Sequence, residues 1–160
     1  MSINLEPYYP GKPTLDEQLD YIKSEYEEVL EAVEEENWEE VCKELLDLKQ
    51  TIVGYYEIKY PNKWRLIIMS NKFEPAFDIS IETLQYFWSY YDDQKMRDRF
   101  NVSLAELYWI ADVNFKRIIK EHDRGNSKYR RELTKRLLDE HYEKLEKRKK
   151  EWAGCDKVEG

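Results

Sequence analysis

The chain has 160 residues, the length of a single domain, and its 41% of hydrophobic residues argues against wholesale disorder. Its formal net charge of −8 argues against nucleic acid or an anionic membrane as a partner. We expect a cytoplasmic protein, because the sequence has neither an N-terminal apolar segment typical of a secretion signal nor a long apolar run. Cys42 and Cys155 fit no metal motif, and we expect both to be structural thiols.

Two amphipathic helices are predicted in the first part of the chain. The first begins at a capping box formed by Thr14 and Glu17 and carries apolar residues at alternating steps of four and three to about Glu35. Asn37 can cap a second helix of the same periodicity, which Pro61 ends. The short break between the two helices predicts an antiparallel hairpin.

Three further helices are predicted in the remainder of the chain. A short apolar segment at 64–69 could be a helical turn or a loop, and helices follow at about 80–100, 103–125 and 127–152. Ser103 and Glu106 form a second capping-box pattern, and Gly125 is expected to stop the helix that they begin. The pattern predicts an all-α helical bundle. We divide the chain into an N-terminal arm (1–13), a helical domain (14–126) and a C-terminal charged helix and tail (127–160).

Two pairs of carboxylates suggest chemistry on the first hairpin. Glu28 and Glu31 are three residues apart, as are Glu44 and Asp47, and this spacing places each pair on one helical face. If the hairpin brings the four groups together, they repel one another unless a cation lies between them, and hard oxygen ligands select Mg²⁺ or Mn²⁺. The neighbouring Glu27 could act as a ligand or as a base. Metal-activated water is the mechanism that these residues support.

The same acidic residues are also compatible with a solvated helix face, because Glu-x-x-Glu pairs are frequent in this sequence. Asp47 is more informative, since an Asp between Leu46 and Leu48 is costly unless it is paired or coordinated. On ideal helices Glu28 and Asp47 point away from the apolar stripes. A site there therefore needs a second surface, from the fourth predicted helix or from a partner subunit.

The acidic pairs resemble the motif of the MazG family of nucleotide pyrophosphohydrolases, a branch of the all-α NTP pyrophosphatases. That motif is Glu-x-x-Glu followed by Glu-x-x-Asp, and here twelve residues separate Glu28-Val29-Leu30-Glu31 from Glu44-Leu45-Leu46-Asp47. The likeness covers about residues 15–56 and includes the stretch EEVLEAVEEENWEEVCKELLDL. It implies a four-helix-bundle core, and it also implies a homodimer or homotetramer.

The resemblance also implies an activity. It implies hydrolysis of a nucleoside or deoxynucleoside triphosphate to the monophosphate and pyrophosphate. The implied ligands of Mg²⁺, or of Mn²⁺, are Glu28, Glu31, Glu44 and Asp47, and Glu27 and Glu28 are the expected catalytic residues. In the fourth helix the resemblance implies phosphate contacts from Asn114, Lys116, Arg117 and Arg124. Basic residues at a helix end could instead complement the helix dipole.

Two other functions stay open on the sequence alone. The first is a non-catalytic helical protein-interaction module, which the charged fifth helix would suit. The second is a dUTPase-type or dCTPase-type housekeeping enzyme of the same fold, or an enzyme that hydrolyses an alarmone. The sequence does not separate these alternatives.

Overall fold

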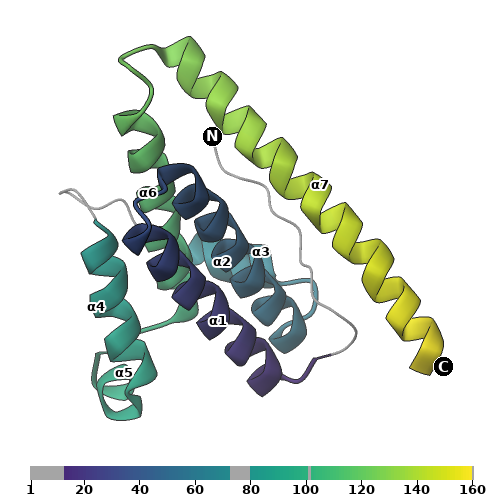
Figure 1. Cartoon of the computed structure of the whole chain (residues 1–160). Helices are drawn as coiled ribbons and strands as arrows, with labels where there is room; N and C mark the ends of the chain where they lie inside the picture. The colour runs from purple at the N-terminus through teal and green to yellow at the C-terminus, as the bar shows by residue number, and fades with distance from the viewer. Residues whose placement is uncertain (1–12, 73–79, 101, 160) are drawn as a thin grey trace.

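The computed structural model describes residues 13–72, 80–100 and 102–159, which form α-helices and no strand (Figure 1). This confirms the predicted all-α class. The helices are α1 (Leu15–Glu34), α2 (Trp38–Lys59), α3 (Trp64–Ser70), α4 (Ile81–Asp92), α5 (Gln94–Phe100), α6 (Leu104–Glu121) and α7 (Ser127–Glu159). Within the described residues, no helix combines the length and apolarity that crossing a membrane requires. The predicted arm lies outside the described residues except for its last residue, Pro13.

The N-terminal caps of the first two helices form as predicted. The Thr14 hydroxyl accepts a hydrogen bond from the Glu17 amide at 3.1 Å, and the Glu17 carboxylate accepts one from the Thr14 amide at 3.3 Å. The Asn37 side chain accepts a hydrogen bond from the Glu40 amide at 3.2 Å. These bonds satisfy amides that have no partner within their own helix, so the sequence sets where each helix begins.

The turn between α1 and α2 contains a residue in the left-handed region, Glu36, with φ of 56°. The Glu36 amide donates to the Val33 carbonyl at 3.1 Å, and the Asn37 amide donates to the Ala32 carbonyl at 3.3 Å. This pair of bonds is the Schellman arrangement, in which the left-handed position usually belongs to glycine. The bonds reverse the chain sharply, so that α2 runs back along α1.

Glu36→Gly is therefore expected to stabilise the protein by about 1 kcal/mol, because glycine adopts the left-handed conformation without the steric cost that a Cβ imposes. Urea denaturation followed by circular dichroism measures the change. The matched variant is Glu35→Gly, one residue earlier, where φ is −75° and glycine should destabilise. A stability loss in Glu36→Gly would contradict the role assigned to this turn.

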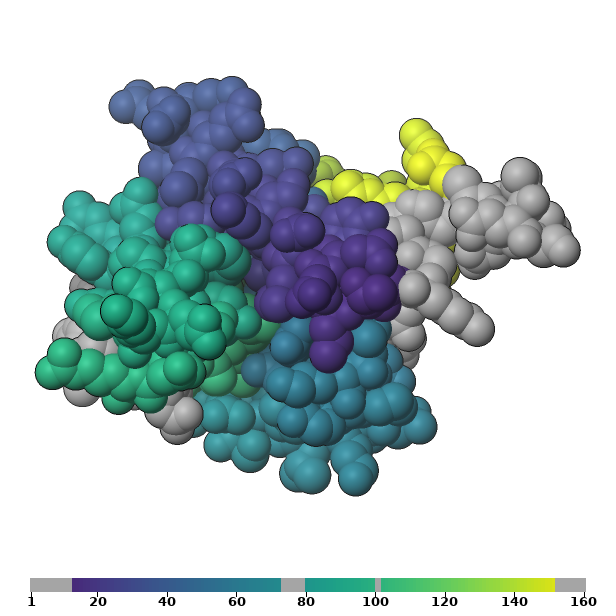
Figure 2. Space-filling view, turned by 90° about the horizontal axis from the view of Figure 1, so that it is seen from below, coloured from purple at the N-terminus to yellow at the C-terminus, as the bar shows by residue number. Residues whose placement is uncertain are grey.

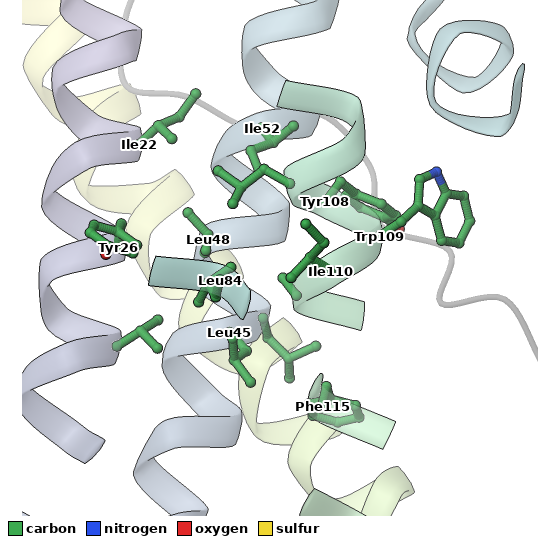
Figure 3. Close-up of a cluster of buried hydrophobic side chains, with 14 of the residues drawn as sticks. Ile22, Tyr26, Leu45, Leu48, Ile52, Leu84, Tyr108, Trp109, Ile110 and Phe115 are labelled. Carbon is green, nitrogen blue, oxygen red and sulfur yellow. The ribbon is translucent and has the colours of Figure 1, made fainter. Parts of the chain in front are cut away.

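Helix α2 lies at the centre of the fold and contacts α1, α3, α6 and α7. Figure 3 shows the apolar cluster that these contacts bury, with side chains of α1, α2 and α6 facing one another. Tyr26 of α1 stacks on Trp88 of α4 with ring centroids 4.7 Å apart, which joins α4 to the same cluster. The labelled members are Ile22, Tyr26, Leu45, Leu48, Ile52, Leu84, Tyr108, Trp109, Ile110 and Phe115.

The predicted third helix and the predicted end of the fourth helix differ from the structure. The single helix predicted at 80–100 is wrong, because Asp93 has extended backbone (φ −91°, ψ 111°) and separates α4 from α5. Its carboxylate accepts hydrogen bonds from the amides of Lys95 and Met96, and this local capping competes with helix continuation. Gly125 is left-handed, with φ of 71°, but α6 already ends at Glu121. The glycine lies in the turn to α7.

Helix α7 extends for 33 residues and lies against α2 and α6 (Figure 1). Seen from below, the C-terminal part of α7 and the pair α4–α5 lie on opposite sides of α1 (Figure 2). Three pairings attach α7 to α2 at steps of four residues on both helices, which indicates that the two helices run parallel here. These pairings are Glu39 with Arg136 (2.7 Å), Lys43 with Glu140 (3.2 Å) and Asp47 with Lys144 (2.5 Å).

Candidate metal centre

Three carboxylates from two helices converge beside α7. Glu25 and Glu28 lie on α1 and Glu44 lies on α2, and one oxygen from each falls within 4.8 Å of the others. The tight turn at Glu36 makes this possible, because it places the middle of α1 against the first half of α2. Glu25 and Glu44 are partly buried, whereas Glu28 is exposed. The group is therefore open to solvent on the side of Glu28.

The proximity of these groups raises the pKa of two of them. Burial is the largest cause for Glu25, followed by the charges of Asp47 and Glu28, and the pKa rises to about 8. Burial is also the largest cause for Glu44, followed by the adjacent Glu28 carboxyl group and the charge of Asp47, and the pKa rises to about 9. The fold thus places carboxyl groups so close to one another that simultaneous ionisation of all of them is unfavourable.

Asp47 is held by α7. Its carboxylate is 2.5 Å from the Lys144 ammonium and 3.3 Å from Nδ1 of His141. Burial would raise the pKa of Asp47, but the adjacent His141 imidazole and the Lys144 ammonium outweigh it and lower the pKa. The side chain is 4% exposed, so the sequence-based expectation that this Asp must be paired or coordinated is met by pairing. The surface facing Asp47 is α7, and not the fourth predicted helix.

The converging group contains a different glutamate pair on α1 from the one that the motif implies. Glu28 and Glu44 belong to the converging group, but Glu31 is exposed and lies outside it, and Glu25 is the third member. Glu27 is also exposed, about 200° around the helix from Glu25. Burial, together with the negative charge of Glu27, raises the pKa of Tyr26. The role of Glu27 as a base therefore has no geometric support from this group.

The predicted phosphate-binding residues on and after α6 have other contacts in the structure. Asn114 is fully buried and donates to the Ile110 carbonyl at 2.9 Å, which leaves it no surface to offer a phosphate. Lys116 pairs with Asp112 at 2.8 Å, and Arg117 pairs with Glu121 at 3.2 Å. Arg124 is exposed, and its guanidinium lies 6.0 Å from the ring centroid of Tyr129. Lys116 and Arg124 therefore remain the most accessible of the four.

A buried lysine was not anticipated from the sequence. Lys49 is 0% exposed, and its ammonium lies 2.7 Å from Asp112 and 4.8 Å from the ring centroid of Tyr108. Burial lowers the pKa of Lys49, although the Asp112 carboxylate acts against that shift. The sequence held an indication, because Lys49 and Asp112 each lie on the apolar stripe of their helix. Opposite charges on two such stripes are typical of a buried ion pair.

The chemistry of the three-carboxylate group fits a hard divalent cation. Oε2 of Glu25 and Oε2 of Glu44 are buried and accept no hydrogen bond from the described residues. Buried carboxylate oxygens are costly unless a donor or a cation satisfies them. Carboxylate oxygens are also the ligands that Mg²⁺ and Mn²⁺ prefer. Glu25, Glu28 and Glu44 could therefore hold such an ion.

The raised pKa values predict how stability depends on pH when a chelator removes divalent cations. In the unfolded chain Glu25 and Glu44 lose their protons near the ordinary value of 4.5, whereas in the fold they keep them to about 8 and about 9. The free energy of unfolding should therefore fall as pH rises across that window. Melting temperatures measured in chelator at intervals from about pH 5 to about pH 9 test this. Glu44→Gln should flatten the fall, and an unchanged slope would contradict the assignment.

No protein-family model, curated protein or solved structure matches the chain. The function is therefore inferred from the geometry and chemistry of the site. The MazG-like motif contributes to it as a resemblance only.

Proposed function

We propose that this protein is a Mg²⁺-dependent nucleoside triphosphate pyrophosphohydrolase of the MazG-like, all-α type. The supporting observation is that Glu28 and Glu44, one from each half of the motif, converge with Glu25 within 4.8 Å. In this proposal α1, α2, the α4–α5 pair and α6 correspond to the four-helix-bundle core of the family. The protein acts as a homodimer or homotetramer.

The residues of the site have distinct tasks in this proposal. Glu25, Glu28 and Glu44 hold Mg²⁺, and the exposed carboxylate of Glu28 is the one that faces solvent and substrate. A bound Mg²⁺ supplies the acidity that makes water a nucleophile near neutral pH, together with charge that offsets the leaving pyrophosphate. Because the pKa values of Glu25 and Glu44 are raised to about 8 and about 9, the two groups release protons when the cation binds.

The products of the reaction define the first experiment. The purified chain is incubated with canonical and modified nucleoside triphosphates and Mg²⁺, and monophosphate and pyrophosphate are quantified. We expect equal amounts of the two products, no release in chelator, and activity restored by Mg²⁺ or Mn²⁺. The panel includes dUTP and dCTP. Preferential hydrolysis of either one would distinguish a housekeeping enzyme of the dUTPase or dCTPase type from an enzyme that acts on other triphosphates. Release of orthophosphate in place of pyrophosphate would contradict cleavage between the α- and β-phosphates.

The second candidate function is a non-catalytic helical interaction module. It is favoured by the pairing of Asp47 with Lys144 and His141, which gives a motif residue a structural role. This function predicts no turnover of any nucleotide and no change in melting temperature on addition of Mg²⁺. The same incubation and one thermal titration therefore decide between the two functions.

A further inference from the structure

The ammonium group of Lys144 on α7 pairs directly with the carboxylate of Asp47 on α2. The ammonium nitrogen lies 2.5 Å from Oδ2 of Asp47, and the Asp47 side chain is 4% exposed. The other oxygen of Asp47 faces Nδ1 of His141 at 3.3 Å. Both oxygens of this motif carboxylate are thus directed at α7. Neither is turned toward open solvent.

Asp47 belongs to the same patch of negative charge as the three converging glutamates. It lies one helical turn after Glu44 on α2, and its charge is among the causes that raise the pKa of both Glu25 and Glu44. Helix α7 presents positive charge to this patch. Lys144 acts on Asp47, and the charge of Arg148 opposes the rise in the pKa of Glu25. A divalent cation entering the patch would meet these positive charges.

We propose that Lys144 competes with a divalent cation for the Asp47 carboxylate, so that α7 sets the metal affinity of the site. This inference rests on the proposed metal centre and adds its regulation. When Lys144 releases Asp47, the Asp47 carboxylate, which points at α7 in the structure, turns toward Glu25, Glu28 and Glu44 and joins them around the cation. When Lys144 is bound, the site offers three carboxylates and binds the ion more weakly.

The structure allows Lys144 to release Asp47 while α7 stays in place. Upstream of Lys144, α7 is anchored by the buried side chains of Leu133 and Leu137 and by the pairing of Arg136 with Glu39 at 2.7 Å. The Lys144 side chain itself is 35% exposed, and its stem has several rotatable bonds. Rotation of the Lys144 side chain into water therefore frees the Asp47 carboxylate without movement of α7. By linkage, whatever loosens this contact strengthens metal binding, and metal binding loosens the contact in return.

The first experiment measures Mg²⁺ binding alone, by calorimetry, with no nucleotide present. Lys144→Gln should bind Mg²⁺ roughly tenfold more tightly than the unmodified protein, because a partly exposed ion pair opposes the cation in the latter. Lys144→Arg, which keeps the charge, should bind Mg²⁺ like the unmodified protein. Lys150→Gln removes one positive charge from an exposed position on the same helix and should change the affinity by less than about twofold.

A double-mutant cycle separates direct competition from a distant charge effect. Asp47→Asn should weaken Mg²⁺ binding more in the Lys144→Gln background than in the unmodified protein, because only there is the carboxylate fully available. Equal losses in the two backgrounds would overturn the competition. Circular dichroism of each variant establishes that the helices are retained.

A measurement on the unmodified protein tests the competition without depending on how well any variant folds. The Lys144 ammonium should give an NMR signal protected from exchange with water while it is paired, and this signal should broaden as Mg²⁺ is added. A signal that persists at saturating Mg²⁺ would overturn the competition and leave the metal centre standing. If neither the unmodified protein nor any variant binds Mg²⁺, the metal centre and the proposed function fail together with this inference.

Discussion

Glu44→Gln is expected to reduce pyrophosphate release by at least about 100-fold, since loss of a group that merely orients a metal ligand already costs 10- to 100-fold. Glu44 is the α2 member of the converging group, and its raised pKa of about 9 shows that the fold disfavours its ionised form. The neutral amide should therefore leave the fold as stable as before, or more stable, in chelator. Loss of activity without loss of stability is the mark of a functional group.

The matched α1 variants test which glutamate pair serves the site. Glu25→Gln should lose activity as Glu44→Gln does, because Glu25 lies within the converging group. Glu31→Gln decides between the structure and the motif, since the motif implies that Glu31 is a ligand and the structure places it outside the group. Glu34→Gln, at an exposed position one turn further along α1, serves as the control for loss of one negative charge. Full activity in both Glu25→Gln and Glu44→Gln would reject the site.

Asp112→Ala is expected to destabilise the protein by about 3–5 kcal/mol, because it leaves the Lys49 ammonium buried without its partner. Lys49 is 0% exposed and lies 2.7 Å from Asp112, so this carboxylate is the charge that compensates the buried ammonium. The pKa of Asp112 is lowered because the ammonium groups of Lys49 and Lys116 outweigh its burial. Urea denaturation near neutral pH, followed by circular dichroism, measures the loss.

Two variants control for the burial of this ion pair. The double replacement Lys49→Met with Asp112→Leu should recover most of the stability, since a buried pair replaced by apolar groups of similar volume is often neutral. Glu121→Ala removes the partner of Arg117 at a site where Glu121 is 54% exposed, and it should cost less than about 1 kcal/mol. A similarly small loss in Asp112→Ala would show that Lys49 finds another acceptor.

Local features of the fold followed directly from the sequence. The all-α class, the caps at Thr14 and Asn37 and the turn before α2 depend on residues within about one helical turn of one another. The acidic pairs on facing helices were equally visible. The break at Asp93 was missed because its side chain competes with helix continuation, and such competition is decided by the balance of local and tertiary contacts.

The arrangement around the candidate site was decided by contacts between distant parts of the chain. The choice of Glu25 over Glu31 depends on the register between α1 and α2, which periodicity alone does not fix. Asp47 was expected to be either paired or coordinated, and its partner Lys144 lies 97 residues away on a helix whose docking surface has few apolar residues. Local sequence determines which residues share a helical face. Only tertiary packing determines which faces meet, because several combinations of helix faces can bury a similar apolar area.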